Sequence, residues 1–204
     1  MNKGLKFFAM LLTMCFVFSF TTMPTYAAET TAKSEYDFIV IKGNVTEEQY
    51  EKLLTNYCAI PLNVREHFQM SEYQIVLTTE RLEDTLFAGM GYGAVCAAYA
   101  PDLEIPSLVF ENNKNGMNAV AHEMGHYVHF NLSWDLFKEW NHLYKDEYDN
   151  MPTKYSKTDV FEGFAECYKL FVMNPSRLKE CSENLYEYME RASNSLPGES
   201  EENL

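Results

Sequence analysis

The segment HEMGH, residues 122–126, restricts the fold of this chain more than any other part of the sequence. His122 and His126 are four residues apart, so on a helix they lie on one face and both imidazoles reach a single Zn²⁺ ion. The flanking residues are apolar (AVA before the motif and Val128 after it), as expected for a helix in a domain core. A chance HExxH on a solvated helix, the alternative, does not fit this context. We therefore predict a buried helix over residues 118–132, in which Glu123 faces the activated water.

A catalytic zinc has three protein ligands and one open position, so a third ligand must be found. His129 follows His126 by three residues, but one straight helix does not wrap three side chains around an ion, and we interpret His129 as a surface residue. Glu162 and Glu166 lie at helical spacing among aromatic and aliphatic residues. Acids on a buried stripe require a partner, and one of them can bind the metal while the other orients a ligating histidine. A solvated pair of carboxylates is the alternative.

The order of the predicted elements indicates an α+β domain, because strands come first and helices second. We expect a small, mostly antiparallel sheet packed on helices. A peptide substrate could add to the sheet along residues 107–111, the strand just before the HEMGH helix. The predicted strands are 36–42, 73–78, 94–99 and 107–111, and the predicted helices are 46–57, 118–132, 135–148, 158–173 and 176–192.

A glycine cluster at Gly89, Gly91 and Gly93 lies between the second and third predicted strands. Glycine-rich loops bind phosphate in some folds, but this one lacks the Lys-Ser/Thr of a P-loop and the helix that follows in a dinucleotide site. We interpret the cluster as a tight turn.

The first 27 residues have the pattern of a signal peptide. Two lysines precede an uncharged apolar run over residues 7–20, and small residues stand at the cleavage position after Ala27. We expect cleavage there, export from the cell, and no membrane association of the mature chain. A lipoprotein acylated at Cys15 is the alternative, but Met14 stands where a small residue is expected.

The remaining 177 residues (204 minus 27) suit one domain. We place the catalytic domain at 28–192 and an acidic tail, expected to be disordered, at 193–204. The mature chain has 14 Lys+Arg (16 minus 2) against 30 Asp+Glu, a net charge of −16. This charge argues against nucleic acid as a partner. We expect a monomer that binds a peptide or protein substrate.

Four cysteines remain after the predicted cleavage: Cys58, Cys96, Cys167 and Cys181. None has the CxxC spacing of a zinc ribbon. An exported protein permits disulfides but does not require them, and a free cysteine commonly packs as a small core residue. Bridges and buried thiols both fit this sequence.

The chain resembles the protease domain of anthrax lethal factor and the smaller secreted Pro-Pro endopeptidases. HEMGH carries this resemblance together with Tyr155, which is followed seven residues later by EGFAECY (residues 162–168). The resemblance implies a zincin-like metalloprotease fold of the gluzincin type with C-terminal helices and one Zn²⁺ per chain. It also implies that Glu162 is the third zinc ligand, that Glu166 is an acid in the shell just outside the ligands, and that Tyr155 hydrogen-bonds the oxyanion.

The sequence departs from these relatives at three points. His129 stands where they usually have Asp, Phe161 stands where the Pro-Pro enzymes have a second Glu, and both tryptophans lie downstream of HEMGH. The resemblance therefore predicts a secreted zinc metalloendopeptidase with Glu123 as general base, but it does not extend to a proline preference. A catalytically silent zincin-like binding or effector module is one alternative. A structural zinc, which would be closed by four protein ligands, is another.

Overall fold

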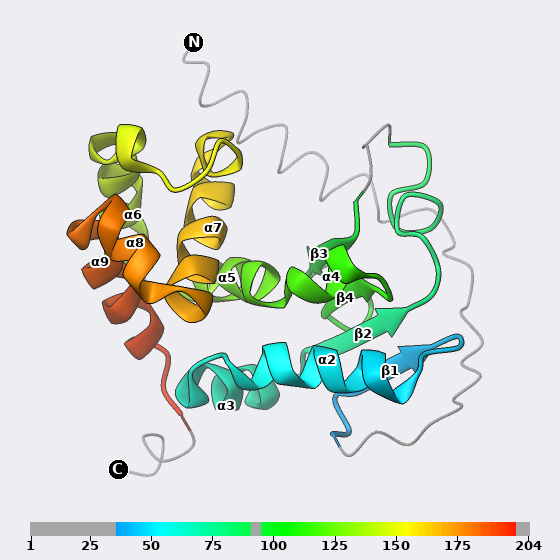
Figure 1. Ribbon diagram of the computed structural model, residues 1–204. Coiled ribbons are helices and arrows are strands. Elements are labelled where there is room, and N and C mark those ends of the chain that lie inside the picture. Colours follow the sequence, from blue (N-terminus) through cyan, green and yellow to red (C-terminus); the bar gives the residue numbers. More distant parts are fainter. Residues whose placement is uncertain (1–35, 91–94, 199–204) are drawn as a thin grey trace.

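The computed structural model describes residues 36–90 and 95–198. The predicted signal peptide, two glycines of the cluster and residues 199–204 lie outside these ranges. Figure 1 shows the sheet in the blue-to-green half of the chain, while the yellow-to-red half is helical. The α+β class is therefore confirmed. Among the described residues the sheet has four strands: β1 (Ile39–Lys42), β2 (Gln74–Thr78), β3 (Ala97–Ala100) and β4 (Ser107–Glu111).

The direction of the strands differs from the prediction. The strand order is β1-β2-β4-β3, and both β1–β2 and β2–β4 are parallel, whereas β3–β4 is antiparallel. A mostly antiparallel sheet was wrong because the connections are long, and a parallel pair needs a long crossover. The β1–β2 crossover holds two helices, α2 (Glu47–Cys58) and α3 (Leu62–Met70). The α2 helix begins with the capping box of Thr46 and Gln49.

The prediction that a peptide substrate adds along residues 107–111 was wrong, because β4 is an interior strand of the sheet. β4 pairs with β2 on one side and β3 on the other, so an added peptide cannot pair along residues 107–111. The prediction assumed that the strand before the HEMGH helix forms the edge, but strand order does not follow sequence order here. On this side of the sheet the edge is β3.

The second half of the chain folds into helices that cover the sheet and each other. The predicted helix over 176–192 is two helices, because Ser182 is extended and caps the second with its side chain. The helices are α4 (Lys114–Asn118), α5 (Val120–Phe130), α6 (Trp134–Asp146), α7 (Val160–Met173), α8 (Pro175–Cys181) and α9 (Glu183–Asn194), with the short 3-10 helices η2 (Tyr148–Asn150) and η3 (Tyr155–Lys157).

The main core lies between one face of the sheet and the helices. Apolar residues of the strands, such as Ile75 and Phe110, pack there with residues of α5, α7 and α9. The other face of the sheet buries a small cluster around Val76 and Val109 under the segment that contains Leu82. The α5 helix is central to this core, and nine of its residues are buried. Their burial fixes the HEMGH segment rigidly in the domain.

The ordered packing of the domain continues beyond residue 192, where the sequence placed its C-terminal end. The α9 helix continues to Asn194, Leu196 is 2% exposed, and Asn63 donates hydrogen bonds to the carbonyls of Ser193 and Leu196. Residues 193–198 are thus packed on α3 and are not a disordered tail.

The four cysteines after residue 27 are free thiols. Cys167 is buried, with its sulfur 3.9 Å from that of Met151. The described helices include none that is both long and apolar enough to cross a membrane.

Candidate metal centre and catalytic site

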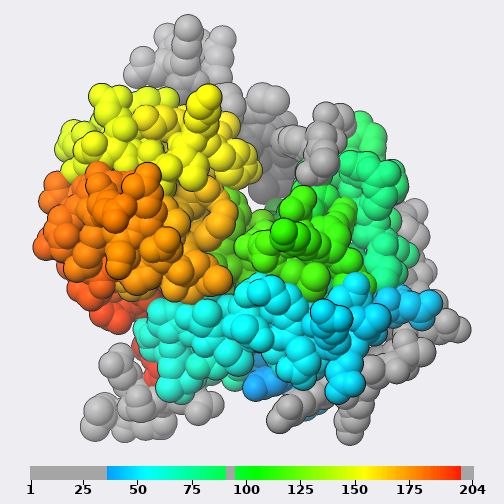
Figure 2. Space-filling model, viewed as in Figure 1, coloured from blue at the N-terminus to red at the C-terminus, as the bar shows by residue number. Residues whose placement is uncertain are grey.

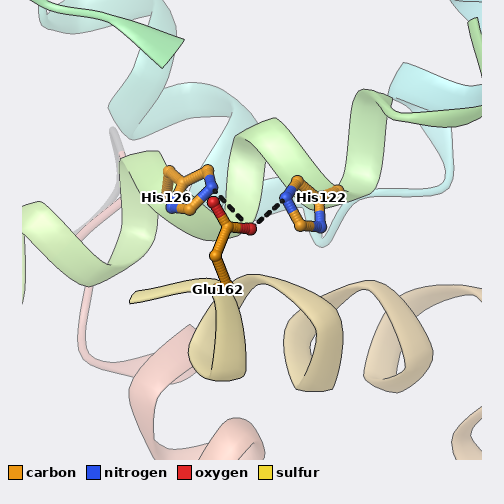
Figure 3. A group of neighbouring side chains, drawn as sticks. All are labelled: His122, His126 and Glu162. Atoms are coloured by element: carbon orange, nitrogen blue, oxygen red, sulfur yellow. Dashed lines mark ion pairs between the residues drawn. The ribbon is translucent and has the colours of Figure 1, made fainter. Parts of the chain in front are cut away.

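His122 and His126 occupy successive turns of α5 and point to the same side of the helix, as Figure 3 shows. Apolar residues such as Val120, Met124 and Val128 anchor the helix in the core. The two imidazole rings lie 4.9 Å apart between centroids. Their spacing therefore places one ring nitrogen of each histidine close to a common point, where both could bind one metal ion.

Glu162 reaches this point from the first turn of α7. Its Oε2 atom lies 3.1 Å from Nε2 of His122 and 3.7 Å from Nε2 of His126. The start of α7 is fixed by Asp159, whose carboxylate accepts hydrogen bonds from the N–H groups of Phe161 and Glu162. One ligand atom from each of the three residues lies within 4.8 Å of the others.

The donor set fits a cation at this point. Nδ1 of His122 lies 3.0 Å from Oε1 of Glu166; if Nδ1 carries the proton, Nε2 presents a lone pair. Oε2 of Glu162 is buried and faces Nε2 of both histidines. This carboxylate oxygen needs a positive charge between itself and the imidazoles. A proton on His122 supplies that charge without metal. A divalent metal would replace the proton, and two His with one carboxylate are common zinc ligands.

The close approach of α5 and α7 depends on Gly125. A Cβ atom at this position would lie 2.8 Å from Cα of Ala165 and 3.1 Å from Cβ of Tyr168. Backbone atoms of α7 cannot move aside cheaply, so only glycine permits this helix separation. The central residues of HEMGH therefore have a packing role in addition to the spacing of the ligands.

Burial and neighbouring charges shift the pKa values of three side chains in the centre. Burial raises the pKa of Glu123 to about 7, and the Glu162 charge adds to this effect, while His122 and the Tyr99 backbone oppose it. Burial and the neighbouring His122 lower the pKa of His126 to about 4. For His122 burial lowers the pKa, but the carboxylates of Glu162 and Glu166 outweigh it and raise the value to about 9.

Tyr155 lies on η3 above the histidines. Its side chain is 52% exposed, and its ring stacks on that of His122 with 5.8 Å between centroids. Burial of its hydroxyl and the Glu162 carboxylate raise the pKa of the phenol above its ordinary value. At neutral pH the phenol is therefore a hydrogen-bond donor.

Glu166 lies behind His122, one turn after Glu162. Its Oε1 contacts Nδ1 of His122 at 3.0 Å and accepts from Lys169 at 2.9 Å, and its Oε2 accepts from the Thr153 hydroxyl at 3.1 Å. Burial raises the pKa of this carboxyl, but His122 and Lys169 outweigh burial and lower it to about 2. The ionised Glu166 therefore fixes the orientation of His122.

His129 is not a surface residue, contrary to the prediction. It is 1% exposed, its ring stacks on Phe164 at 4.5 Å, and neither ring nitrogen has a hydrogen-bond partner among the described residues. The metal-ligand group of the described residues does not include it. The sequence did not show this burial because it arises from the packing of α6 and α7 on α5.

A cleft of about 640 Å³ opens over the centre, with β3 on one side and the start of α7 on the other. Figure 2 shows a notch between the sheet half and the helical half of the molecule. Tyr99, Phe130 and Phe161 form a row of stacked rings along this cleft, with centroids 5.3 and 5.6 Å apart. No sequence pattern predicted this row, because its members come from three elements and share no spacing.

A solved structure, the PRO-PRO endopeptidase (PPEP-2) from Paenibacillus alvei, is similar to this fold. The alignment has a TM-score of 0.55 and 15% sequence identity, and it covers 76% of this chain and 96% of that chain. No protein-family model and no curated protein matches the sequence. At this identity the likeness shows the fold alone.

Proposed function

We propose that this chain is a zinc-dependent endopeptidase that hydrolyses peptide bonds in extended protein segments. The observation that carries the proposal is the meeting of His122, His126 and Glu162 at one point of a cleft, with Glu123 beside them. His122, His126 and Glu162 would hold one Zn²⁺, which would act as a Lewis acid and lower the pKa of a water molecule.

Glu123 is the general base of this proposal. Burial raises its pKa in the absence of metal, and a carboxylate beside the attacking water can accept a proton and return it. Glu123 takes a proton from the attacking water and passes it to the leaving amine. Tyr155 donates a hydrogen bond to the carbonyl oxygen as negative charge develops there. These roles require both groups in the cleft, which they line.

The substrate is expected to pair with β3 and not with β4. β3 has one neighbour, β4, among the described strands, and Ala97, Ala98 and Tyr99 line the cleft. The Tyr99 backbone also donates a hydrogen bond to Glu123, so the outer edge of β3 faces the catalytic base. An extended peptide on this edge would pass directly over the metal ligands.

The predicted signal peptide supports export as the setting of this activity. The resemblance to lethal factor and to secreted Pro-Pro endopeptidases supports the same setting and adds Tyr155 and Glu162 to the expected catalytic group.

The variant Glu123→Gln tests the proposal, since it keeps the shape of the side chain and removes the base. We expect zinc content equal to that of the wild type and a loss of peptide cleavage of about 1,000-fold or more. Peptide libraries with mass-spectrometric detection measure cleavage, and atomic absorption measures zinc.

Exposed Glu104→Gln is the matched control, and it should cleave like the wild type. Cleavage that survives in Glu123→Gln would refute the assigned base. A wild-type protein that binds zinc and cleaves no peptide would favour the silent binding module.

A further inference from the structure

The tyrosine of the candidate site lies within a hydrogen-bonded turn, residues 153–156. The Thr153 N–H donates to the Ser156 hydroxyl at 3.0 Å, and that hydroxyl donates to the Thr153 carbonyl at 2.7 Å. The Ser156 N–H in turn donates to Oγ1 of Thr153 at 2.9 Å. Ser156 is completely buried. These bonds fix the backbone around Lys154 and Tyr155, which lie between the two residues.

The same threonine contacts the carboxylate that orients a metal ligand. Its hydroxyl donates to Oε2 of Glu166, while Oε1 of Glu166 contacts His122 and Lys169. The two oxygens of Glu166 therefore have different roles, since one orients His122 and the other holds the turn. Because Glu166 is ionised, the bond from Thr153 is charge-assisted and stronger than a neutral one.

Tyr155 needs this support because the core does not hold its side chain. The residue is half exposed, and among the described residues its side chain contacts only the candidate site, through ring stacking on His122 and a hydrogen bond with Glu162. The backbone of Tyr155 is also restrained by Thr158, whose N–H and hydroxyl donate hydrogen bonds to the Tyr155 carbonyl. A donor that must meet a developing charge has to be positioned before the reaction occurs.

We propose that Thr153 is a positioning residue, which links Glu166 to the turn of Tyr155 and so sets the phenol against the metal ligands. This inference rests on the proposed function, in which Tyr155 donates to the carbonyl oxygen. Thr153 is not one of the proposed metal ligands and does not line the cleft. It acts through Tyr155, so its removal should matter only while the Tyr155 hydroxyl is present.

Thr153→Val tests the link, because it keeps the shape of the side chain and removes the hydroxyl. We expect kcat to fall about tenfold with KM within about twofold, as for an interaction that acts in the transition state. Thr153→Ser restores the hydroxyl and should recover most of the rate. Thr55→Val, at an exposed position of α2, is the matched control and should behave like the wild type.

A double-mutant cycle separates positioning from general damage. In a Tyr155→Phe background, Thr153→Val should change kcat less than about twofold. An equal loss in both backgrounds, or a serine variant as impaired as the valine variant, would overturn the proposal. The cycle uses any peptide that the wild type cleaves.

A second readout does not depend on activity. Fluorotyrosine placed at position 155 gives a single ¹⁹F resonance that reports the surroundings of this ring. We expect Thr153→Val to shift or broaden this resonance in the zinc-free protein, and Thr55→Val to leave it unchanged. An unchanged resonance in Thr153→Val would refute the link even if the wild type proved to have no peptidase activity, whereas that lack of activity alone would refute the proposed function.

Discussion

At the scale of single residues, His129 is a buried polar group with no hydrogen bond to offset its loss of water. Aromatic rings surround it, among them Phe137, Phe161 and Phe164. Burial, and to a smaller extent His126, lowers its pKa to about 3. The folded protein therefore keeps this imidazole neutral, and an unpaired buried group of this kind lowers stability.

We expect His129→Phe to raise the free energy of unfolding by about 1 kcal/mol at pH 7.5, because it removes the unpaired nitrogens. The folded pKa lies below the ordinary value, so the stability that His129 contributes is complete above pH 6.5 and is lost as the pH falls toward 3. The phenylalanine variant should therefore lose less stability in acid, by up to about 1.4 kcal/mol per pH unit.

Urea denaturation at pH 7.5 and pH 5 measures both effects. His142→Phe is the control, since His142 is exposed on α6, and it should keep the pH dependence of the wild type. Equal pH dependence in the wild type and His129→Phe would contradict the prediction.

The candidate site was largely predictable residue by residue, because its spacings are local. His122 and His126 share a helix face through a four-residue separation, and Glu162 and Glu166 do the same on α7. Thr153 and the ring row of the cleft were not predictable in this way. Their roles arise from contacts between elements far apart in the chain, and a single sequence carries no spacing that reveals them.

At the scale of elements, strand positions were easier to predict than strand directions. β1 and β2 are short runs of β-branched and aliphatic residues, which the sequence shows directly. Strand direction depends on which strands become neighbours in the sheet. Here β3 comes before β4 in the chain, but β3 lies at the edge of the sheet, beyond β4. The α3 helix was missed because its N-cap, Pro61, makes no side-chain hydrogen bond that would mark its start.

The contact between α5 and α7 sets the geometry of the proposed metal ligands, so Gly125→Ala should disturb both packing and metal binding. The added methyl would meet the backbone of Ala165, and overpacking of this kind costs about 1–3 kcal/mol. Separation of the helices would also move Glu162 from the histidines. We expect a lower free energy of unfolding and zinc affinity reduced by about tenfold or more.

Urea denaturation and competition with a zinc-binding dye measure the two effects of Gly125→Ala. Ser176→Ala, at an exposed position of α8, is the control and should leave both unchanged. Wild-type zinc affinity in Gly125→Ala would show that the helix contact does not determine the ligand geometry.

At the scale of the whole molecule, the centre joins the helical half to the sheet half. The proposed ligands lie on α5 and α7, while β3 borders the cleft and contacts Glu123 through its backbone. A metal that binds the folded chain alone stabilises all of these elements together. Its removal should therefore lower the stability of the domain as a unit.

Zinc removal should also change how stability depends on pH. Without metal the folded pKa of His122 is about 9, above the ordinary value of 6.5. Its contribution to stability is then complete below pH 6.5 and is lost as the pH rises through 9. We expect the chelated protein to lose about 1 kcal/mol between pH 7.5 and pH 8.5, which corresponds to about 2–4 °C in Tm.

Zinc competes with this proton, so the zinc-loaded protein should show no such loss in the same interval. His126, with a pKa of about 4, is neutral throughout and does not alter this expectation. Calorimetric scans with zinc and with chelator at both pH values make the comparison, and His122→Gln should remove the difference in slope. Parallel pH slopes for the wild type with and without zinc would mean that His122 does not exchange a proton for the metal, and the assignment of this ligand would then fail.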